Sequence, residues 1–396
     1  MSTASSRTPR LRAVRREDAR VTPLELFFDL VFVLALTQCT ALMADRPTWV
    51  GIAQGVLVLG VLWWSWVGYA WLTSVIDPEE GAVRVAMFVS MAGLLVAALC
   101  VPGAFDEYGL AFAGAYLVVR VAHISLFVLA SRDEPALRRS VMGLAGSTAV
   151  GVTLLTAAAF TDGALQGGLW VLALVLDAGG PFLFGAEGWK LVPGHFAERH
   201  GLILIIALGE SIVAIGVGAE AGVSVGIAAA AVLGVVVASA QWWLYFDVVA
   251  IVAERKLAEA PVGRVQNEMA RDSYSYLHFP MVAGIVLVAL GLKKTIEHVE
   301  DPLKLVPAAA FLGGTALYLL AHVAFRYRNV HSLNRHRLGC AVVVVALLPL
   351  ALEVPALVTL AVVAALLAAL IAWEAIRFAE ARERIRHQLV GEHPGA

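Results

Sequence analysis

Charged residues are scarce in this chain. They make up 15% of its 396 residues, while hydrophobic residues make up 60%. Soluble globular proteins contain about 25% charged and about 45–50% apolar residues. The sequence cannot supply the polar surface that a soluble protein of this length needs, so a soluble protein is excluded. The net charge of −2 gives no indication of nucleic-acid binding, and no nucleic-acid partner is expected.

Cysteines are also few. Cys39, Cys100 and Cys340 each lie within an apolar stretch, and none has a neighbour at a zinc-site spacing, which argues against a disulfide framework or a metal cluster. We interpret them as small buried apolar side chains. The chain contains no P-loop, no G-x-S-x-G, no H-E-x-x-H and no dinucleotide fingerprint. We therefore expect neither a metal nor a cofactor, and we predict no catalytic residue.

Long apolar stretches make up most of the chain. About 20 apolar residues cross a hydrocarbon core of about 30 Å, and a spanning segment must be helical because lipid offers no partner for a free backbone N–H or C=O. We predict an all-α integral membrane fold with twelve transmembrane helices, of which the eleventh is short and the least secure, because Pro349 lies within it and Pro355 follows it. The predicted spans are 24–43, 48–70, 85–103, 109–131, 140–161, 167–185, 201–219, 225–250, 276–294, 304–325, 338–353 and 355–377.

The Lys and Arg residues fall mainly on one side of these spans. With the N-terminus inside, 24 of the 29 lie in cytoplasmic segments and four in outer loops, and Arg120 lies within a span. The positive-inside rule then places both termini in the cytoplasm. Residues 1–22 are expected to form a basic cytoplasmic tail without the apolar stretch of a signal peptide, and residues 379–396 a second cytoplasmic tail.

Two halves of the chain, 23–190 and 195–378, show the same order of aromatic and polar residues. The matching residues include Trp63-Trp64 with Trp242-Trp243, Ala122-His123 with Ala321-His322, and Asp177 with Glu374. The order, more than any single pair, indicates two tandem six-helix repeats. Because six is even, both repeats have the same orientation, as in transporters with parallel repeats.

Two acids begin the first span. A charge at the bilayer centre costs about 2.5–3.5 kcal/mol on insertion scales, so acids within spans are candidates for binding an ion or solute. Glu25 and Asp29 are four residues apart and share one helix face. Their repulsion predicts that one carboxyl stays protonated or that both share a cation. The alternative is that Glu25, just after Pro23, only stabilises the helix N-terminus.

Glu210 lies about 15 Å along the seventh span from His200, close to mid-membrane. Gly209 before it leaves room for another backbone or an ion, and Ser211 after it offers a hydroxyl. We predict that Glu210 and Ser211 bind the transported species. The alternative is a structural carboxyl that bonds to a neighbouring helix.

Arg120 in the fourth span cannot lose its charge and therefore needs a partner. Asp177 in the sixth span, or Glu210, could supply it, either as a structural ion pair or as part of a path. Asp247 lies at the inner end of the eighth span and completes the candidate set. His278, His322 and Glu374 also lie near inner ends of spans, and we interpret most of this group as interfacial.

Two further clusters of residues have structural explanations that need no bound ligand. His195, Glu198 and His200 could hold a metal ion, but Arg199 among them would repel a cation. The tryptophans near Trp63 and Trp242 are typical of helix packing and of the aromatic belts of membrane proteins.

Five segments carry a recognisable pattern: 22–33, 195–202, 208–211, 242–247 and 276–280. With Phe-Phe-Asp at 27–29 and Gly-Glu-Ser at 209–211, they resemble the bacterial low temperature requirement A protein family over roughly residues 20–380. The resemblance implies a multi-pass protein of the bacterial cytoplasmic (inner) membrane, in a family named after a growth phenotype in the cold. A fainter similarity links the first span to potassium channels with six-helix repeats, which carry Phe-Ser-Asp where this chain has Phe28-Asp29.

Three functions fit these observations. The first is a transporter or channel for a small ion or solute, with proton coupling as an option, in which Asp29, Asp177 and Glu210 line a path that Arg120 tunes. The second is a membrane sensor or assembly factor that acts during cold stress. The third is an intramembrane lipid-modifying enzyme. The expected partners are the lipid bilayer and the small ion or solute, and a homo-oligomer is compatible with the sequence.

Overall fold

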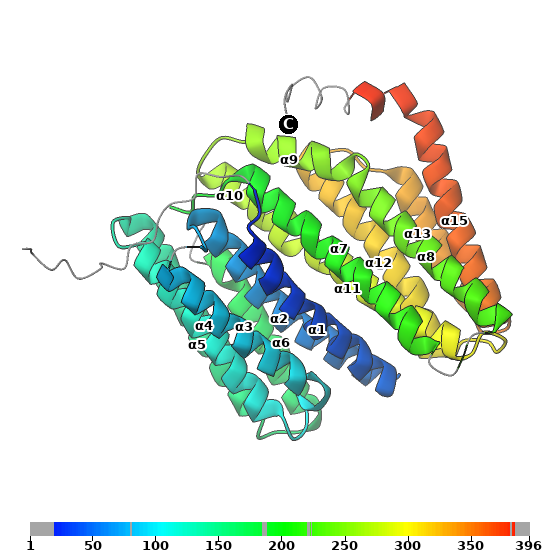
Figure 1. Ribbon diagram of the computed structural model, residues 1–396, viewed down its shortest axis with the longest axis horizontal. Coiled ribbons are helices and arrows are strands. Elements are labelled where there is room, and N and C mark those ends of the chain that lie inside the picture. The colour runs from blue at the N-terminus through cyan, green and yellow to red at the C-terminus, as the bar shows by residue number, and fades with distance from the viewer. Residues whose placement is uncertain are drawn as a thin grey trace, which may run out of the picture. The chain divides into compact units, whose positions relative to one another are not determined.

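The computed structural model describes residues 20–79, 81–183, 188–219, 222, 224–380 and 382–384, and within these the chain is helical apart from short connections (Figure 1). Most of the two predicted tails, 1–22 and 379–396, lies outside the described residues. The helical fold class is confirmed. Its longer helices are α1 (Pro23–Asp45), α2 (Trp49–Val75), α3 (Gly81–Cys100), α4 (Gly109–Ala130), α5 (Pro135–Ala158), α6 (Gly163–Leu183), α7 (Pro193–Gly218), α8 (Val225–Phe246), α11 (His278–Glu297), α12 (Leu305–Val330) and α15 (Ala356–Arg377).

Shorter helices connect or extend these. They are the 3₁₀-helix η1 (Val101–Gly103), α9 (Val249–Glu259), α10 (Arg264–Met269), the π-helix η2 (Ala270–Tyr276), α13 (Arg335–Ala346) and α14 (Leu348–Ala351).

Eleven helical stretches among the described residues are long and apolar enough to cross a membrane. They correspond to the predicted spans with one exception, the segment 338–353. That segment forms α13 and α14 instead of one helix, and Pro349 stands at the start of α14, where a proline lacks the N–H that would continue the preceding helix. At about 1.5 Å per residue, the 12 residues of α13 reach about 18 Å, short of a hydrocarbon core of about 30 Å. A twelfth span is therefore not confirmed.

Among the described residues, one compact unit contains those up to Phe32 together with those within Trp64–Phe196. Within it, α3 packs against α4, α4 against α5, and α5 against α6. Backbones approach closely where α5 meets α6, because a Cβ atom added to Gly151 would lie 3.1 Å from the Cβ of Asp177. Small residues of this kind allow polar side chains of neighbouring membrane helices to meet.

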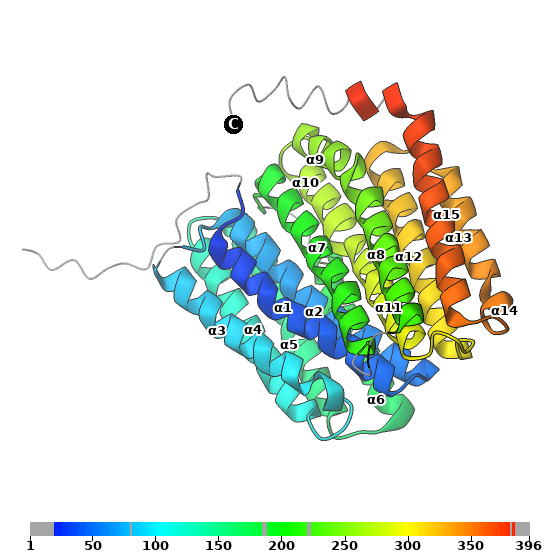
Figure 2. The same ribbon diagram turned by 45° about the vertical axis from the view of Figure 1, so that its right-hand side comes forward.

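The other compact unit contains Val33–Trp63 and the described residues from Ala197 onward. In this unit α11 packs against α12, and the two helices lie side by side in Figures 1 and 2. A Cβ atom added to Gly284 or to Gly314 would lie 2.7 Å from the carbonyl oxygen of the other glycine. The two backbones are therefore in direct contact, as small residues permit in membrane helix pairs. In the same unit, α12 packs against α13, and α8 against α15.

The bounds of the two units differ from those of the predicted halves 23–190 and 195–378, because α1, α2 and α7 each contribute residues to both units. The tandem repeat and the domain bounds derived from it stay predictions.

Candidate functional site

The carboxylate of Asp177 is held by three side chains in the first of these units. Arg120 donates from Nη2 to Oδ1 at 2.9 Å, Thr148 donates to Oδ1 at 2.8 Å, and Tyr116 donates to Oδ2 at 2.7 Å. Arg120 also donates to the Thr148 hydroxyl. The side chains of Arg120 and Asp177 are 1% and 4% exposed. Both oxygens of Asp177 are thus bonded and its charge is neutralised.

The structure shows which of the two candidate acids pairs with Arg120. The partner is Asp177 and not Glu210. The sequence did not indicate Tyr116 or Thr148. Tyr116 precedes Arg120 by one helical turn of α4, so both reach the same carboxylate, and Thr148 arrives from α5 where that helix meets α6 at Gly151. The network ties α4, α5 and α6 together.

Glu25 begins a second buried network in the same unit. Its Oε2 accepts hydrogen bonds from the backbone N–H of Thr22 at 2.8 Å and from the Thr22 hydroxyl at 3.0 Å. The backbone N–H of Glu25 donates in return to the Thr22 hydroxyl at 3.4 Å. This is a capping box, in which the first turn of a helix is closed by reciprocal side-chain bonds. Glu25 does therefore stabilise the start of α1, as the structural alternative predicts.

The other oxygen of Glu25 has a different partner. Oε1 lies 2.8 Å from Nε2 of His195, and neither side chain is exposed. The Nδ1 atom of His195 lies 2.9 Å from the hydroxyl of Ser74. A histidine that faces a carboxylate carries its proton on the facing nitrogen, so Nε2–H donates to Glu25. The chain Ser74–His195–Glu25 links α2, α7 and α1 through groups that can each exchange a proton.

Asp29 uses a different partner again. Its Oδ1 accepts a hydrogen bond from the indole Nε1 of Trp66 at 2.8 Å, and the aspartate is buried. The two acids of the first span thus share a helix face as predicted, but the structure gives each its own donors. Trp66 was expected only to pack against neighbouring helices, and its indole N–H gives it a polar role as well.

Glu210 lies in the second unit and is 2% exposed. Its Oε2 accepts a hydrogen bond from the hydroxyl of Thr37 in α1 at 2.6 Å. Among the described residues, no Lys, Arg or His lies within ion-pair distance of Glu210. Lys293 of α11 and Cys39 of α1 interact with it at longer range. The charge of the Glu210 carboxylate is therefore compensated by neighbouring groups much less than the charge of Asp177.

Gly209 and Ser211 flank Glu210 in α7. The hydroxyl of Ser211 is buried and has no hydrogen-bond partner within the described part of the chain. A Cβ atom added to Gly209 would meet nothing within 4 Å, so none of the described neighbouring backbones uses the room that this glycine leaves. α7 thus carries, at consecutive positions, a carboxylate without a cation at ion-pair distance and a hydroxyl without a partner among the described residues.

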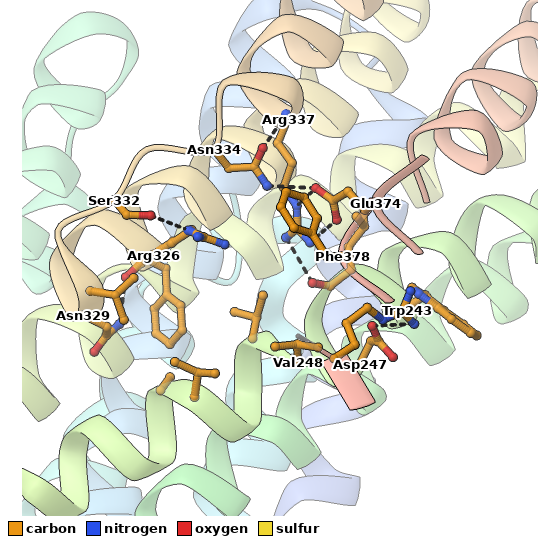
Figure 3. Close-up of a pocket in the computed structure, with 17 residues that line it drawn as sticks. Trp243, Asp247, Val248, Arg326, Asn329, Ser332, Asn334, Arg337, Glu374 and Phe378 are labelled. Carbon is orange, nitrogen blue, oxygen red and sulfur yellow. Dashed lines mark hydrogen bonds and ion pairs between the residues drawn. The ribbon is translucent and has the colours of Figure 1, made fainter. Parts of the chain in front are cut away.

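Asp247 follows the last residue of α8, at the helix end where the sequence predicts it, and its Oδ2 lies 2.8 Å from Nη2 of Arg382. Arg382 also lies over the ring of Trp243, 5.5 Å from its centre. Asp247 lines a cavity of about 450 Å³, here called the α8–α15 cavity (Figure 3). The residues that line this cavity are distant in the sequence from Glu210 and Asp177.

The rings of His278 and His322 are both buried within the protein, and their position at the membrane interface stays a prediction. His278 donates from Nδ1 to the carbonyl of Ser273 at 3.0 Å and accepts at Nε2 from the hydroxyl of Tyr245 at 2.9 Å. Nδ1 of His322 accepts from Nη1 of Arg337 at 3.2 Å. Both rings are thus hydrogen-bonded to groups of their own unit. Within the described residues, no group of three His, Cys, Asp or Glu side chains is placed to hold a metal ion.

Eleven apolar helices with buried acids and a buried arginine define a multi-span helical membrane protein. The family model of the bacterial low temperature requirement A protein (LtrA) matches residues 20–372, and the chain belongs to this family. An uncharacterized protein of Rhizobium meliloti (strain 1021) is 31% identical to it over 330 residues, which are 80% of each chain. No solved structure matches the chain.

Proposed function

We propose that the protein transports a small ion or solute across the bacterial inner membrane, coupled to protons through Glu210. The observation that carries this proposal is the contrast between two buried acids. Asp177 has an arginine and two hydroxyls as partners, whereas the carboxyl of Glu210 has the hydroxyls of Thr37 and Thr40 and no cation at ion-pair distance among the described residues.

A buried carboxylate without a cation is costly, since removing an ion from water costs several kcal/mol even after relaxation. The group meets this cost either by taking up a proton or by holding a cation. Ionisable residues inside membrane segments commonly mark ion paths and proton relays for this reason. Glu210 can alternate between the two states, and the free hydroxyl of Ser211 beside it offers a further ligand.

The membrane arrangement extends this proposal. Twelve spans in two tandem repeats, with both termini in the cytoplasm, would place Glu210 in the first helix of the second repeat. The surplus of Lys and Arg in the predicted cytoplasmic segments supports this orientation, and in each half the third and fourth long helices pack together, as α3 with α4 and α11 with α12. The family description supports a role in growth at low temperature. A homo-oligomer stays compatible with this arrangement.

Flux through proteoliposomes tests the proposal. The wild-type protein is reconstituted with a pH-sensitive dye inside, and proton movement is followed after imposing potassium, sodium or pH gradients. We expect Glu210→Gln to abolish the flux while leaving the melting temperature in detergent near the wild-type value. Unchanged flux in Glu210→Gln would refute the transport proposal.

The matched control replaces the other buried acid together with its partner. Arg120→Leu/Asp177→Leu removes an ion pair of similar burial, and we expect it to retain flux if it folds. Loss of flux in the control alone, with flux retained in Glu210→Gln, would indicate that the transport path runs through the Asp177 network instead.

A sensor or assembly factor is the second candidate, and the saturated Asp177 network favours it. If every buried acid only locks helices together, substitution of any of them lowers stability and none changes a flux. The lipid-modifying enzyme has less support. Ser74, His195 and Glu25 form a serine–histidine–acid chain, but Ser74 is 2% exposed and His195 and Glu25 are 0% exposed, so neither water nor a lipid ester reaches the hydroxyl.

A further inference from the structure

The α8–α15 cavity combines apolar walls with an excess of positive charge. Three arginines and two acids line it. Asp247 is paired with Arg382 at 2.8 Å. Glu374 is paired with Arg337, whose Nη2 and Nε lie 2.8 and 3.0 Å from the two carboxylate oxygens. These two pairs cancel, so the charge of the cavity is set by the third arginine, Arg326.

Arg326 of α12 is held at one nitrogen only. Its Nε donates to the hydroxyl of Ser332 at 2.9 Å, which fixes the plane of the guanidinium group. Neither terminal nitrogen has an acceptor among the described residues, and no acid there lies within ion-pair distance. Figure 3 shows the guanidinium of Arg326 on the side of the cavity opposite Asp247. The four N–H groups on the two terminal nitrogens are thus available to an oxyanion, and arginine binds phosphate through such a fork.

The remaining walls are apolar and partly open. Phe325, Val248 and Val252 line the interior, while Phe378 and Trp243 are 44% and 38% exposed. The cavity lies where α8, α12 and α15 end, and the chain there is rich in arginine. Helix ends of spanning segments lie at the level of lipid headgroups, where tryptophan also concentrates. A ligand that fits is apolar at one end and anionic at the other.

We propose that the α8–α15 cavity binds the headgroup of an anionic phospholipid. The phosphate accepts hydrogen bonds from the terminal nitrogens of Arg326, and the upper part of an acyl chain lies along Phe378 and Trp243. Basic pockets between membrane helices on the cytoplasmic side commonly recognise anionic headgroups. This site is independent of Glu210 and of transport. A zwitterionic lipid fits less well, because its ammonium group would add a second positive charge to a cavity with one already unpaired.

Lipid binding to the purified full-length protein in detergent tests the proposal. The probes are short-chain phosphatidylglycerol, phosphatidylcholine with the same chains, and inorganic phosphate, each titrated by native mass spectrometry and by the shift in melting temperature. We expect phosphatidylglycerol to bind the wild type more tightly than phosphatidylcholine does, and phosphate alone to bind weakly. Equal binding of the two lipids would overturn the proposal, and phosphate binding as tight as that of phosphatidylglycerol would assign the site to the free anion.

Two variants locate the binding. Arg326→Gln removes the unpaired guanidinium, and we expect it to weaken phosphatidylglycerol binding by about tenfold, as one charge-assisted hydrogen bond implies. Arg326→Lys keeps the charge without the fork and should lose less. The matched control is Arg335→Gln, which removes the same charge from the exposed first turn of α13 outside the cavity lining. Unchanged binding in Arg326→Gln, or an equal loss in Arg335→Gln, would overturn the assignment to this cavity.

Discussion

Glu25 and His195 are 170 residues apart in the sequence, and their side chains meet at 2.8 Å with no exposure of either. The pair joins the first turn of α1 to the first turn of α7, the two helices that open the predicted halves. Glu25 is at the same time the closing residue of a capping box with Thr22. One carboxylate thus fixes both the start of its own helix and the start of another.

Breaking the Glu25–His195 pair from either side should destabilise the protein strongly. Removal of one partner of a buried pair costs about 3–5 kcal/mol, and we expect Glu25→Ala or His195→Ala to approach that range. The double variant should cost much less than the sum of the two. Thermal melting of the wild type, the two single variants and the double variant in detergent provides this double-mutant cycle. Additive losses of stability would show that the two groups do not interact.

The Asp177 network should behave as a structural unit. Arg120→Leu leaves the buried carboxylate of Asp177 without its cation, and we expect a loss of about 3–5 kcal/mol. Arg120→Leu/Asp177→Leu should recover most of it, because two apolar side chains replace the pair. Thr148→Val removes one neutral donor and should cost about 1 kcal/mol. Melting temperatures check the order, and a double variant as unstable as Arg120→Leu would contradict it.

Thr37→Val tests the hydrogen bond to Glu210. It removes the hydroxyl donor to that carboxyl, and an unsatisfied buried acceptor costs about 1–3 kcal/mol. In a Glu210→Leu background the same substitution should cost less, since the Val33 carbonyl, 3.2 Å from the Thr37 hydroxyl, is then its one remaining acceptor among the described residues. The comparison of Thr37→Val in the two backgrounds by thermal melting isolates this bond, and equal losses in both would show that Thr37 acts elsewhere.

The contact between α11 and α12 predicts opposite effects for two adjacent glycines. Gly314→Ala places a Cβ atom 2.7 Å from the carbonyl oxygen of Gly284, and overpacking of this kind costs about 1–3 kcal/mol. Gly313→Ala meets nothing within 4 Å and should stabilise the helix by up to about 1 kcal/mol. Melting of the two variants side by side measures the difference, and equal effects would contradict the close contact.

The sequence predicted the helices well because spanning segments must be long, apolar and internally hydrogen-bonded. It predicted one helix for the segment 338–353, where the structure has α13 and α14, because the apolar composition hides the break before Pro349. It predicted that Arg120 needs an acid, but could not choose between Asp177 and Glu210, since both lie at similar depth. The sequence did not predict the roles of Ser74, Tyr116 and Thr148. A single hydroxyl in an apolar helix gives the same sequence pattern whether it bonds to its own backbone or to a distant acid. The burial of His278 and His322 depended on packing that no sequence spacing reveals.

The glycine contact also bears on movement. Helices separated by side chains can slide by changing rotamers, but α11 and α12 touch backbone to backbone at Gly284 and Gly314, where there is nothing to rearrange. If the proposed transport involves a conformational cycle, we expect α11 and α12 to move together as one unit. The bending in such a cycle would then fall on the segments at their ends, such as the π-helix Ala270–Tyr276, whose irregular backbone is the kind often found at functional sites.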